Sequence, residues 1–282
     1  MIGLVTDSNS QIPPSLTERF GVTVVPLSVT IDGVTYLEGI DLDADAFYAR
    51  FGPGRTVPSV STAQPSPGQF AAAYQGLADA GVASVLSVHI GSAVSGTVNA
   101  ARLGATKAPV PVHIVDSGTA SFAVALCVWA AGEAIEGGAD LYVAADAAER
   151  TAATTGTVFV LQALDLARAG GRLAAGIEDA PAIPVLTMAD GVMQVVGHAA
   201  DLAQAVDAMA AHVAAAAGGE GTRLRVGVGI GDAAMAPLYE ALEGRLADLD
   251  GVEEVVRYRI GPSVGVHTGP GTVGVMYGRV NG

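Results

Sequence analysis

The chain has 282 residues, half of them apolar, and a formal net charge of −14. This length allows one large domain or two ordinary ones, and the acidic balance excludes a nucleic-acid-binding surface and attraction to anionic membranes. The single cysteine excludes a disulfide framework, and the amino terminus lacks the basic segment of a signal peptide. The longest apolar run, 120–132, is too short and too alanine-rich to span a bilayer and predicts a buried helix. We therefore expect a cytoplasmic protein with no stable membrane insertion.

The first half of the chain alternates predicted strands and helices. Short apolar runs end in polar residues after Val5, Ile90 and Val115, and the segments between them carry helical spacing and cap signals. This order predicts a doubly wound, mostly parallel α/β sheet whose ligand site lies beyond the carboxyl ends of the strands. The predicted strands are 2–5, 22–29, 83–89 and 112–115, and the predicted helices end at Phe20 or cover 44–51, 69–80, 119–137 and 139–153.

The second half has a different pattern, which predicts an α+β domain with a mixed sheet. Two apolar runs flank Ala189-Asp190-Gly191, a sequence typical of a hairpin. We place the domain boundary near residue 154, so that 1–154 form the amino-terminal domain and 155–282 the carboxy-terminal one. The predicted strands are 158–161, 183–188, 192–196, 224–230, 252–260 and 272–280, and the predicted helices are 164–169, 201–217 and 233–249.

The loop after the strand at Val85–Ile90 is the strongest candidate binding element. It reads Gly91-Ser92-Ala93-Val94-Ser95-Gly96-Thr97 and leads into a predicted helix. Unpaired N–H groups and the positive end of the helix dipole favour an anion there, such as a carboxylate or a phosphate. Ser92, Ser95 and Thr97 add hydroxyl donors. The alternative is that Ser95 only caps the helix.

Two other stretches bring hydroxyl or imidazole groups into rigid settings. Thr62 lies between prolines that hold it in an extended shape, either for a ligand or as a plain loop. His267 lies in the run 260–271, which has four glycines and two prolines and predicts an unusual backbone path. His267 is either a site residue or a structural loop histidine.

Several motifs are absent or favour a structural role. There is no Walker sequence, and Gly227-Val228-Gly229-Ile230-Gly231 is interpreted as a tight strand exit because it lacks dinucleotide-binding spacing. The five histidines are scattered, so we expect no metal site. The acidic stretch 38–45 is interpreted as a solvated loop whose Asp43 caps the next helix.

Four separated patches occur in the order and spacing of one family. They are Thr6-Asp7-Ser8, Ser61-Thr62-Ala63-Gln64-Pro65-Ser66, Ser92-Ala93-Val94-Ser95-Gly96-Thr97 and His267-Thr268-Gly269-Pro270-Gly271. Asp116-Ser117 and the stretch from Leu164 to Leu173 fit the same scheme. On these residues the chain resembles the DegV family over essentially its full length.

The resemblance implies a long-chain fatty acid bound between two α/β domains, with no other cofactor. It implies carboxylate contacts from Thr62 and Ser95, with His267 close by, and Ser92 and Gly96 in the same loop. In many bacteria such proteins serve as the binding subunit of a two-part fatty acid kinase, and the resemblance implies that Arg172 faces the kinase partner. The family usually has a basic cluster after the second-domain hairpin, whereas 197–202 here contains no arginine or lysine.

Two other functions remain open from the residues alone. The first is a serine-based acyl hydrolase or transferase with Ser95 as nucleophile and His267 as base. No nucleophile elbow of the form G-x-S-x-G surrounds Ser92 or Ser95, which argues against it. The second is a binder of a small phosphate ligand at the same helix start, against which the lack of lysine beside the loop counts.

Overall fold

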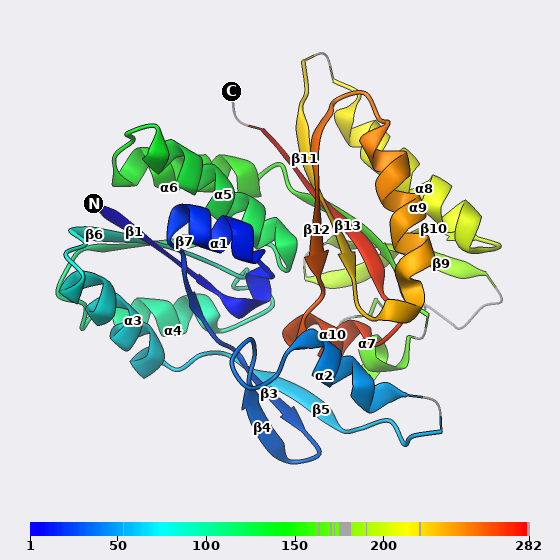
Figure 1. Ribbon diagram of the computed structural model, residues 1–282, viewed down its shortest axis with the longest axis horizontal. Coiled ribbons are helices and arrows are strands. Elements are labelled where there is room, and N and C mark those ends of the chain that lie inside the picture. The colour runs from blue at the N-terminus through cyan, green and yellow to red at the C-terminus, as the bar shows by residue number, and fades with distance from the viewer. Residues whose placement is uncertain are drawn as a thin grey trace.

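The computed structural model describes residues 1–52, 54–162, 164–169, 171, 173–174, 182–189, 191–219 and 221–280 (Figure 1). Its first sheet has four parallel strands in the order β2-β1-β6-β7. The strand order and parallel pairing confirm the doubly wound sheet predicted from the first half. These strands are β1 (Ile2–Asp7), β2 (Thr23–Val25), β6 (Ser84–His89) and β7 (Val112–Asp116).

Helices cover both faces of this sheet because neighbouring strand residues point to opposite sides. Leu4 and Leu86 pack with one set of helices, and the adjacent Val5 and Val85 pack with the other. The first face is covered by α5 (Phe122–Glu136) and α6 (Leu141–Ala152), with α1 (Pro14–Phe20) beside them; the second is covered by α3 (Pro67–Asp79) and α4 (Thr97–Ala105).

The second large sheet is mixed, as predicted. Its order is β10-β9-β8-β13-β11-β12, and among the pairs formed by its described residues only β11 with β12 is parallel. Helices α8 (Leu202–Ala217) and α9 (Ala236–Ala247) cover one face, and α7 (Asp165–Ala169) lies near the carboxyl end of β8. The strands are β8 (Gly156–Val160), β9 (Ile183–Ala189), β10 (Val192–Ala199), β11 (Leu224–Ile230), β12 (Val252–Arg259) and β13 (Val273–Arg279). This arrangement of two sheets agrees with two domains, and the boundary near residue 154 stays a prediction.

Helix α5 lies between the two large sheets and is apolar on all sides from Phe122 to Gly132. Val124 and Val128 pack toward the parallel sheet, whereas Phe122 and Trp129 pack toward Tyr258 of the mixed sheet. A helix that is buried all round needs no polar face, which explains the run 120–132 and confirms the predicted buried helix. Within the described residues, no helix combines the length and the apolar character that crossing a membrane requires.

Gly227 and Gly229 lie inside β11 and Gly231 directly follows it, so the run ends the strand before a helix as predicted, and its glycines also make room for packing. Side chains added at Gly227 and Gly229 would collide with the rings of Phe122 and Tyr258, which themselves stack with centroids 4.8 Å apart. A Cβ at Gly231 would lie 3.1 Å from the Tyr48 ring. Each of these glycines leaves the space that an aromatic ring occupies, and we call these positions aromatic sockets. Two of the three rings come from the first half of the chain.

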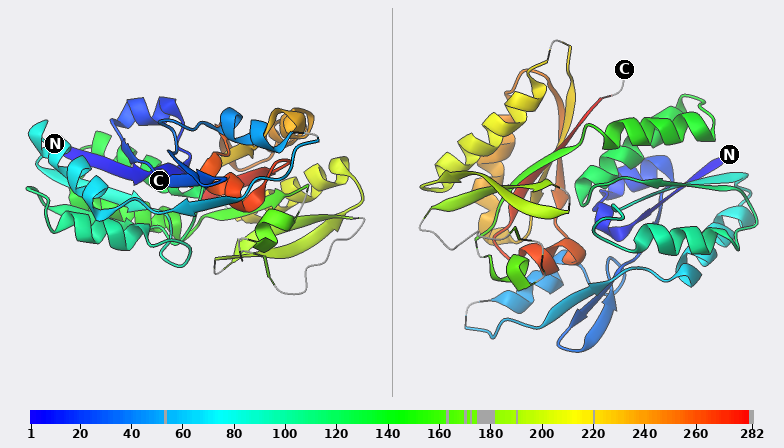
Figure 2. Two further views of the ribbon diagram at one scale, coloured as in Figure 1. Left: turned by 90° about the horizontal axis from the view of Figure 1, so that it is seen from below. Right: turned by 180° about the vertical axis from the view of Figure 1, so that it is seen from behind.

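A third, three-stranded antiparallel sheet was not predicted. The expected strand 22–29 is broken at Pro26-Leu27, and its second part pairs with two further strands, the first of which follows it through an Asp32-Gly33 turn. Both views in Figure 2 place this sheet at the junction of the two larger ones, where it packs with α2 (Ala44–Tyr48) on α10 (Pro262–Thr268). Its strands are β3 (Ser28–Ile31), β4 (Val34–Leu37) and β5 (Val60–Ala63).

Candidate functional site

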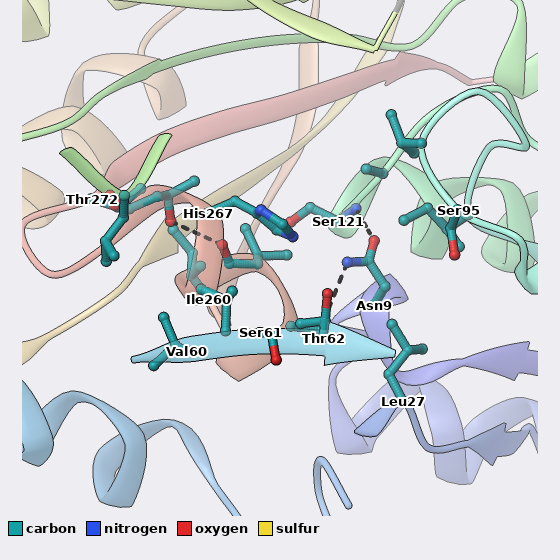
Figure 3. A pocket seen from close by; sticks show the side chains of 18 of the residues that line it. Asn9, Leu27, Val60, Ser61, Thr62, Ser95, Ser121, Ile260, His267 and Thr272 are labelled. Atoms are coloured by element: carbon teal, nitrogen blue, oxygen red, sulfur yellow. Dashed lines mark hydrogen bonds between the residues drawn. The ribbon is translucent and has the colours of Figure 1, made fainter. Parts of the chain in front are cut away.

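A cavity of about 690 Å³ lies where the three sheets meet. Figure 3 shows side chains from distant parts of the chain converging on it. The mixed sheet and α7 supply mainly apolar side chains, namely Phe159, Leu166, Ala169, Met188, Met193 and Met276. The polar side chains come mainly from the first half and α10, namely Asn9, Thr62, Gln64, Ser95, Ser121, Ser263 and His267. A cavity of this size with one polar wall suits a small amphipathic ligand.

Thr62 reaches the cavity from β5. The prolines at 58 and 65 flank this segment, and the predicted extended shape is observed as a strand paired to β3, with Thr62 opposite the fully buried Val29. The pairing fixes the backbone of Thr62, which is half-buried and lines the cavity.

Ser95 and Gly96 line the cavity at the start of α4. The loop forms a tight turn in which Ser95 N–H donates to Gly91 O at 3.1 Å. Ser95 Oγ lies 2.8 Å from Thr97 Oγ1 and accepts from Thr97 N–H at 3.3 Å, so it satisfies one amide of the first turn although Gly96 is the cap residue. The Gln64 side chain lies so close to Gly96 that a Cβ there would sit 2.6 Å from Gln64 Oε1.

Ser92 is not among the described residues that line the cavity. Its N–H donates to Asp116 Oδ1 at 3.1 Å, and Gly118 N–H donates to the same oxygen at 3.1 Å. Burial opposes ionisation of Asp116, but hydrogen bonds from Ser92 and Gly118 outweigh it and hold the pKa of Asp116 below its ordinary value. Ser92 therefore ties the loop to the end of β7.

His267 lies in the last turn of α10, so the expected irregular path over 260–271 is wrong for its first part. Positive φ angles at Gly269 (73°) and Gly271 (77°) follow the helix and turn the chain into β13. The start of α10 is held by Glu38, whose Oε1 accepts from Ser263 N–H at 2.8 Å. His267 is half-buried, lines the cavity and is drawn near Ser121 in Figure 3. Arg172 lies outside the described residues.

Sequence reasoning missed Ser121, Ser263 and Tyr258, which also line the cavity. Ser121 N–H donates to Asn9 Oδ1 at 2.9 Å, and Asn9 Nδ2 donates to Ser263 Oγ at 3.3 Å. Asn9 directly follows the Thr6-Asp7-Ser8 patch, but its partners are 112 and 254 positions away. No local pattern reveals contacts over such separations.

A buried hydrogen-bonded array fixes the ends of the parallel strands. His89 Nδ1 lies 2.9 Å from Asp7 Oδ2, and His89 Nε2 lies 2.6 Å from Ser87 Oγ, which also contacts Tyr74 OH at 3.0 Å. The order matches a Ser–His–Asp triad, yet Ser87 is fully buried and is not a lining residue. Because Asp7 Oδ1 also accepts from Asn9 N–H, the array positions Asn9 at the cavity wall.

The cavity wall carries little charge. Among its described lining residues only His267 and Tyr258 are ionisable, and burial raises the pKa of Tyr258 well above its ordinary value, so its hydroxyl stays neutral. An anion there would be held by neutral donors, by the positive ends of helix dipoles and by His267. Within the described residues, no three histidine, cysteine, aspartate or glutamate side chains are grouped as a metal ion would need.

Known proteins match this chain over almost its whole length. Residues 1–279 match the family described as "Uncharacterised protein, DegV family". A DegV domain-containing protein of Streptomyces coelicolor is 32% identical over 280 residues, which is 98% of this chain and 97% of the relative. A DegV domain-containing protein of Deinococcus radiodurans is 33% identical over 282 residues, with 97% of each chain covered.

Solved structures show the same fold. One described as "Fatty Acid Binding of a DegV family Protein from Thermus thermophilus" has a TM-score of 0.85 and 32% identity, with 99% of both chains covered. DegV from Bacillus subtilis, described as a fatty acid binding protein, has a TM-score of 0.86 at 24% identity, again with 99% of both chains covered. From the family match and the relatives above 30% identity, the chain belongs to the DegV family.

Proposed function

We propose that this protein binds a long-chain fatty acid, with the carboxylate at Thr62, Ser95 and His267 and the acyl chain along the apolar wall. The observation that carries the proposal is that one cavity joins the hydroxyl and imidazole groups of three separate elements to an apolar wall from the mixed sheet. The Thermus thermophilus relative, described by its fatty acid binding, supports the same ligand class.

The apolar and polar walls of the cavity contribute differently to the binding free energy. Each buried methylene contributes about 0.8 kcal/mol, so a sixteen-carbon chain contributes on the order of 11 kcal/mol before ordering costs. Each hydrogen bond to the carboxylate contributes roughly 1.5–3 kcal/mol. The tail therefore supplies most of the affinity, and the head-group contacts select acids over uncharged lipids.

The test begins with organic extraction of the purified protein and mass spectrometry of the extract, followed by titration with palmitate and oleate. The double variant Thr62→Ala/Ser95→Ala is expected to weaken palmitate binding at least about 100-fold, because two charge-assisted bonds are lost. The matched control is Ser84→Ala/Thr106→Ala, which changes the same residue types at the far ends of β6 and α4. Failure to bind either acid would refute the proposal, and unchanged affinity in the first variant would refute the site.

A finer part of the proposal concerns the bound acid's fate. The protein presents the carboxylate to a separate kinase, in line with the role that the DegV resemblance implies. The assay is formation of acyl phosphate from palmitate and ATP when a fatty acid kinase catalytic subunit is added, with Arg172→Ala as the variant that lowers the rate. No product from a kinase that acts with another DegV-family protein would contradict this part.

The two alternatives have less support at this cavity. Ser95 Oγ contacts Thr97 Oγ1 at 2.8 Å, and no bond between Ser95 and His267 is among the contacts of the described residues. The described lining residues include no lysine or arginine for a phosphate group. Burst release from a p-nitrophenyl ester, lost in Ser95→Ala, would favour the hydrolase instead.

A further inference from the structure

Ser121 is a buried polar residue with an unused hydroxyl. Its side chain lines the cavity described above, only 2% of the residue is exposed, and within the described part of the chain no group completes a hydrogen bond to Ser121 Oγ. Tyr258 is its neighbour in the wall. Burial raises the pKa of Tyr258, and the nearby Ser121 hydroxyl offsets part of this rise. The contact between the two hydroxyl groups does not have the geometry of a hydrogen bond. A buried hydroxyl of this kind calls for a hydrogen-bond partner, and the described residues leave that partner to be supplied from the cavity.

The backbone holds Ser121 in place at some cost. Its φ of 58° and ψ of −150° lie in a region that glycine adopts readily and other residues avoid. The hydrogen bond from Ser121 N–H to Asn9 fixes this conformation, and Asn9 is in turn held by Asp7 and Ser263. The hydroxyl is therefore pre-positioned in the cavity wall.

Ser121 is also the N-cap residue of a long buried helix, to which it bonds through its backbone carbonyl but not through its side chain. Helix α5 has 15 residues, its cap side chain makes no bond to the first turn, and that turn contains no acidic residue. Its first residues, Phe122 and Ala123, are at most 1% exposed, so the helix dipole is little screened by water. The positive end of α5 thus reaches the cavity wall uncompensated.

The starts of α4 and α5 lie side by side. Gly91 N–H donates to Thr119 O at 2.7 Å, and a Cβ at Gly91 would lie 2.7 Å from the carbonyl carbon of Gly118. Ser95 and Ser121, which follow these contacts in their loops, both line the one cavity and flank Asn9 in Figure 3. Two helix starts are therefore available to one anionic group.

We propose that Ser121 and the first turn of α5 form a second half of the carboxylate site, so that the ligand's head group is held between the starts of α4 and α5. This inference rests on the proposed fatty acid binding and adds a donor that no sequence pattern assigned. Ser121 Oγ donates to the carboxylate, and Asn9 positions Ser121.

The test compares Ser121→Ala and Ser121→Gly with the wild type and with Ser84→Ala at the far end of β6. Palmitate and hexadecanol affinities are measured by calorimetry, and thermal unfolding checks the fold. Both Ser121 variants are expected to lose about 10- to 100-fold in palmitate affinity and less than about 3-fold in hexadecanol affinity. Ser84→Ala is expected to match the wild type in both.

The glycine variant separates a binding role from a structural one, because glycine accepts the backbone conformation without strain. Palmitate affinity in Ser121→Gly equal to that of the wild type would overturn the inference, as would equal losses for the acid and the alcohol. If the wild type bound palmitate no better than buffer, the proposed function itself would fall, and this outcome is distinct from the other two.

Discussion

His89 Nδ1 lies 2.9 Å from Asp7 Oδ2 in a fully buried pair that joins the ends of β1 and β6. The same carboxylate accepts from Ile90 N–H at 3.1 Å and from Asn9 N–H at 3.1 Å. One acidic side chain therefore holds two strand ends and the cavity residue Asn9.

Replacing this acid should cost stability and ligand binding together. Asp7→Ala leaves three buried donors without a partner and is expected to lower the free energy of unfolding by about 3–5 kcal/mol. Urea unfolding measures this loss, and palmitate affinity should fall because Asn9 is released. The control is Asp79→Ala on the exposed end of α3, which should change unfolding by less than about 1 kcal/mol. Equal stability of the two variants would contradict the role of Asp7.

Two glycines of one loop should respond differently to alanine. A Cβ at Gly91 would meet backbone atoms of Gly118 and Thr119, whereas a Cβ at Gly96 would meet only the end of the Gln64 side chain. Gly91→Ala is expected to destabilise by about 1–3 kcal/mol, because the loops must separate. Gly96→Ala should keep its thermal stability but bind palmitate more weakly, since Gln64 must leave its place in the wall. A larger stability loss in Gly96→Ala than in Gly91→Ala would refute this account.

The aromatic sockets of β11 give a third prediction. Gly227→Ala places a methyl group on the Phe122 ring, which is fully buried and cannot turn away, so a loss of at least about 2 kcal/mol is expected. Gly244 lies in the exposed interior of α9 with nothing within 4 Å, and Gly244→Ala should raise stability by about 0.5–1 kcal/mol. Opposite signs in urea unfolding are the expected result, and a loss in both variants would count against the socket.

Glu38 should give stability a pH dependence. Burial raises the pKa of Glu38 above its ordinary value of 4.5, and bonds from Ser8 and Ser263 offset only part of this rise. Glu38 therefore holds its proton more tightly in the folded state than in the unfolded chain. Its contribution to the free energy of unfolding is fully present below the ordinary pKa of 4.5 and is lost as the pH rises through the pKa of the folded state.

The measurement is urea unfolding of wild type, Glu38→Gln and the exposed Glu18→Gln from about pH 4 to about pH 8. The wild type should lose stability relative to Glu38→Gln as the pH rises, whereas Glu18→Gln should run parallel to the wild type. Parallel curves for the wild type and Glu38→Gln would show that Glu38 does not titrate in this way.

The elements that local chemistry defines could be predicted from the sequence. Asp43 was predicted as a helix cap, and it accepts a bond from its own first turn. Ser66 and Asp201 carry the same local signal and make the same kind of bond. These signals need only neighbouring residues, so one sequence suffices. The Asp32-Gly33 turn carried the same kind of local signal for the β3–β4 hairpin, which was nevertheless missed because the two strands have only four residues each.

Elements that depend on distant partners could not be predicted. Helix α10 contains Gly265, a poor helix former, at the point where the rings of Phe47 and Tyr48 approach it most closely. Packing against another part of the chain therefore decides that 262–268 is helical. The role of Ser121 likewise depends on Asn9, which no helix or strand period connects to it.

Gly227 and Gly229 of β11, and Gly231 directly after it, constrain how this chain can vary. Phe122, Tyr258 and Tyr48 reach that strand from three different elements, so a side chain at any one glycine disturbs a different joint of the assembly. A variant that bound no ligand in the cavity would still need glycine at these positions in order to fold. Retention of these glycines in a related sequence would therefore indicate only that the fold is kept. Retention of the hydroxyl-bearing loops across the cavity would indicate that the ligand is the same.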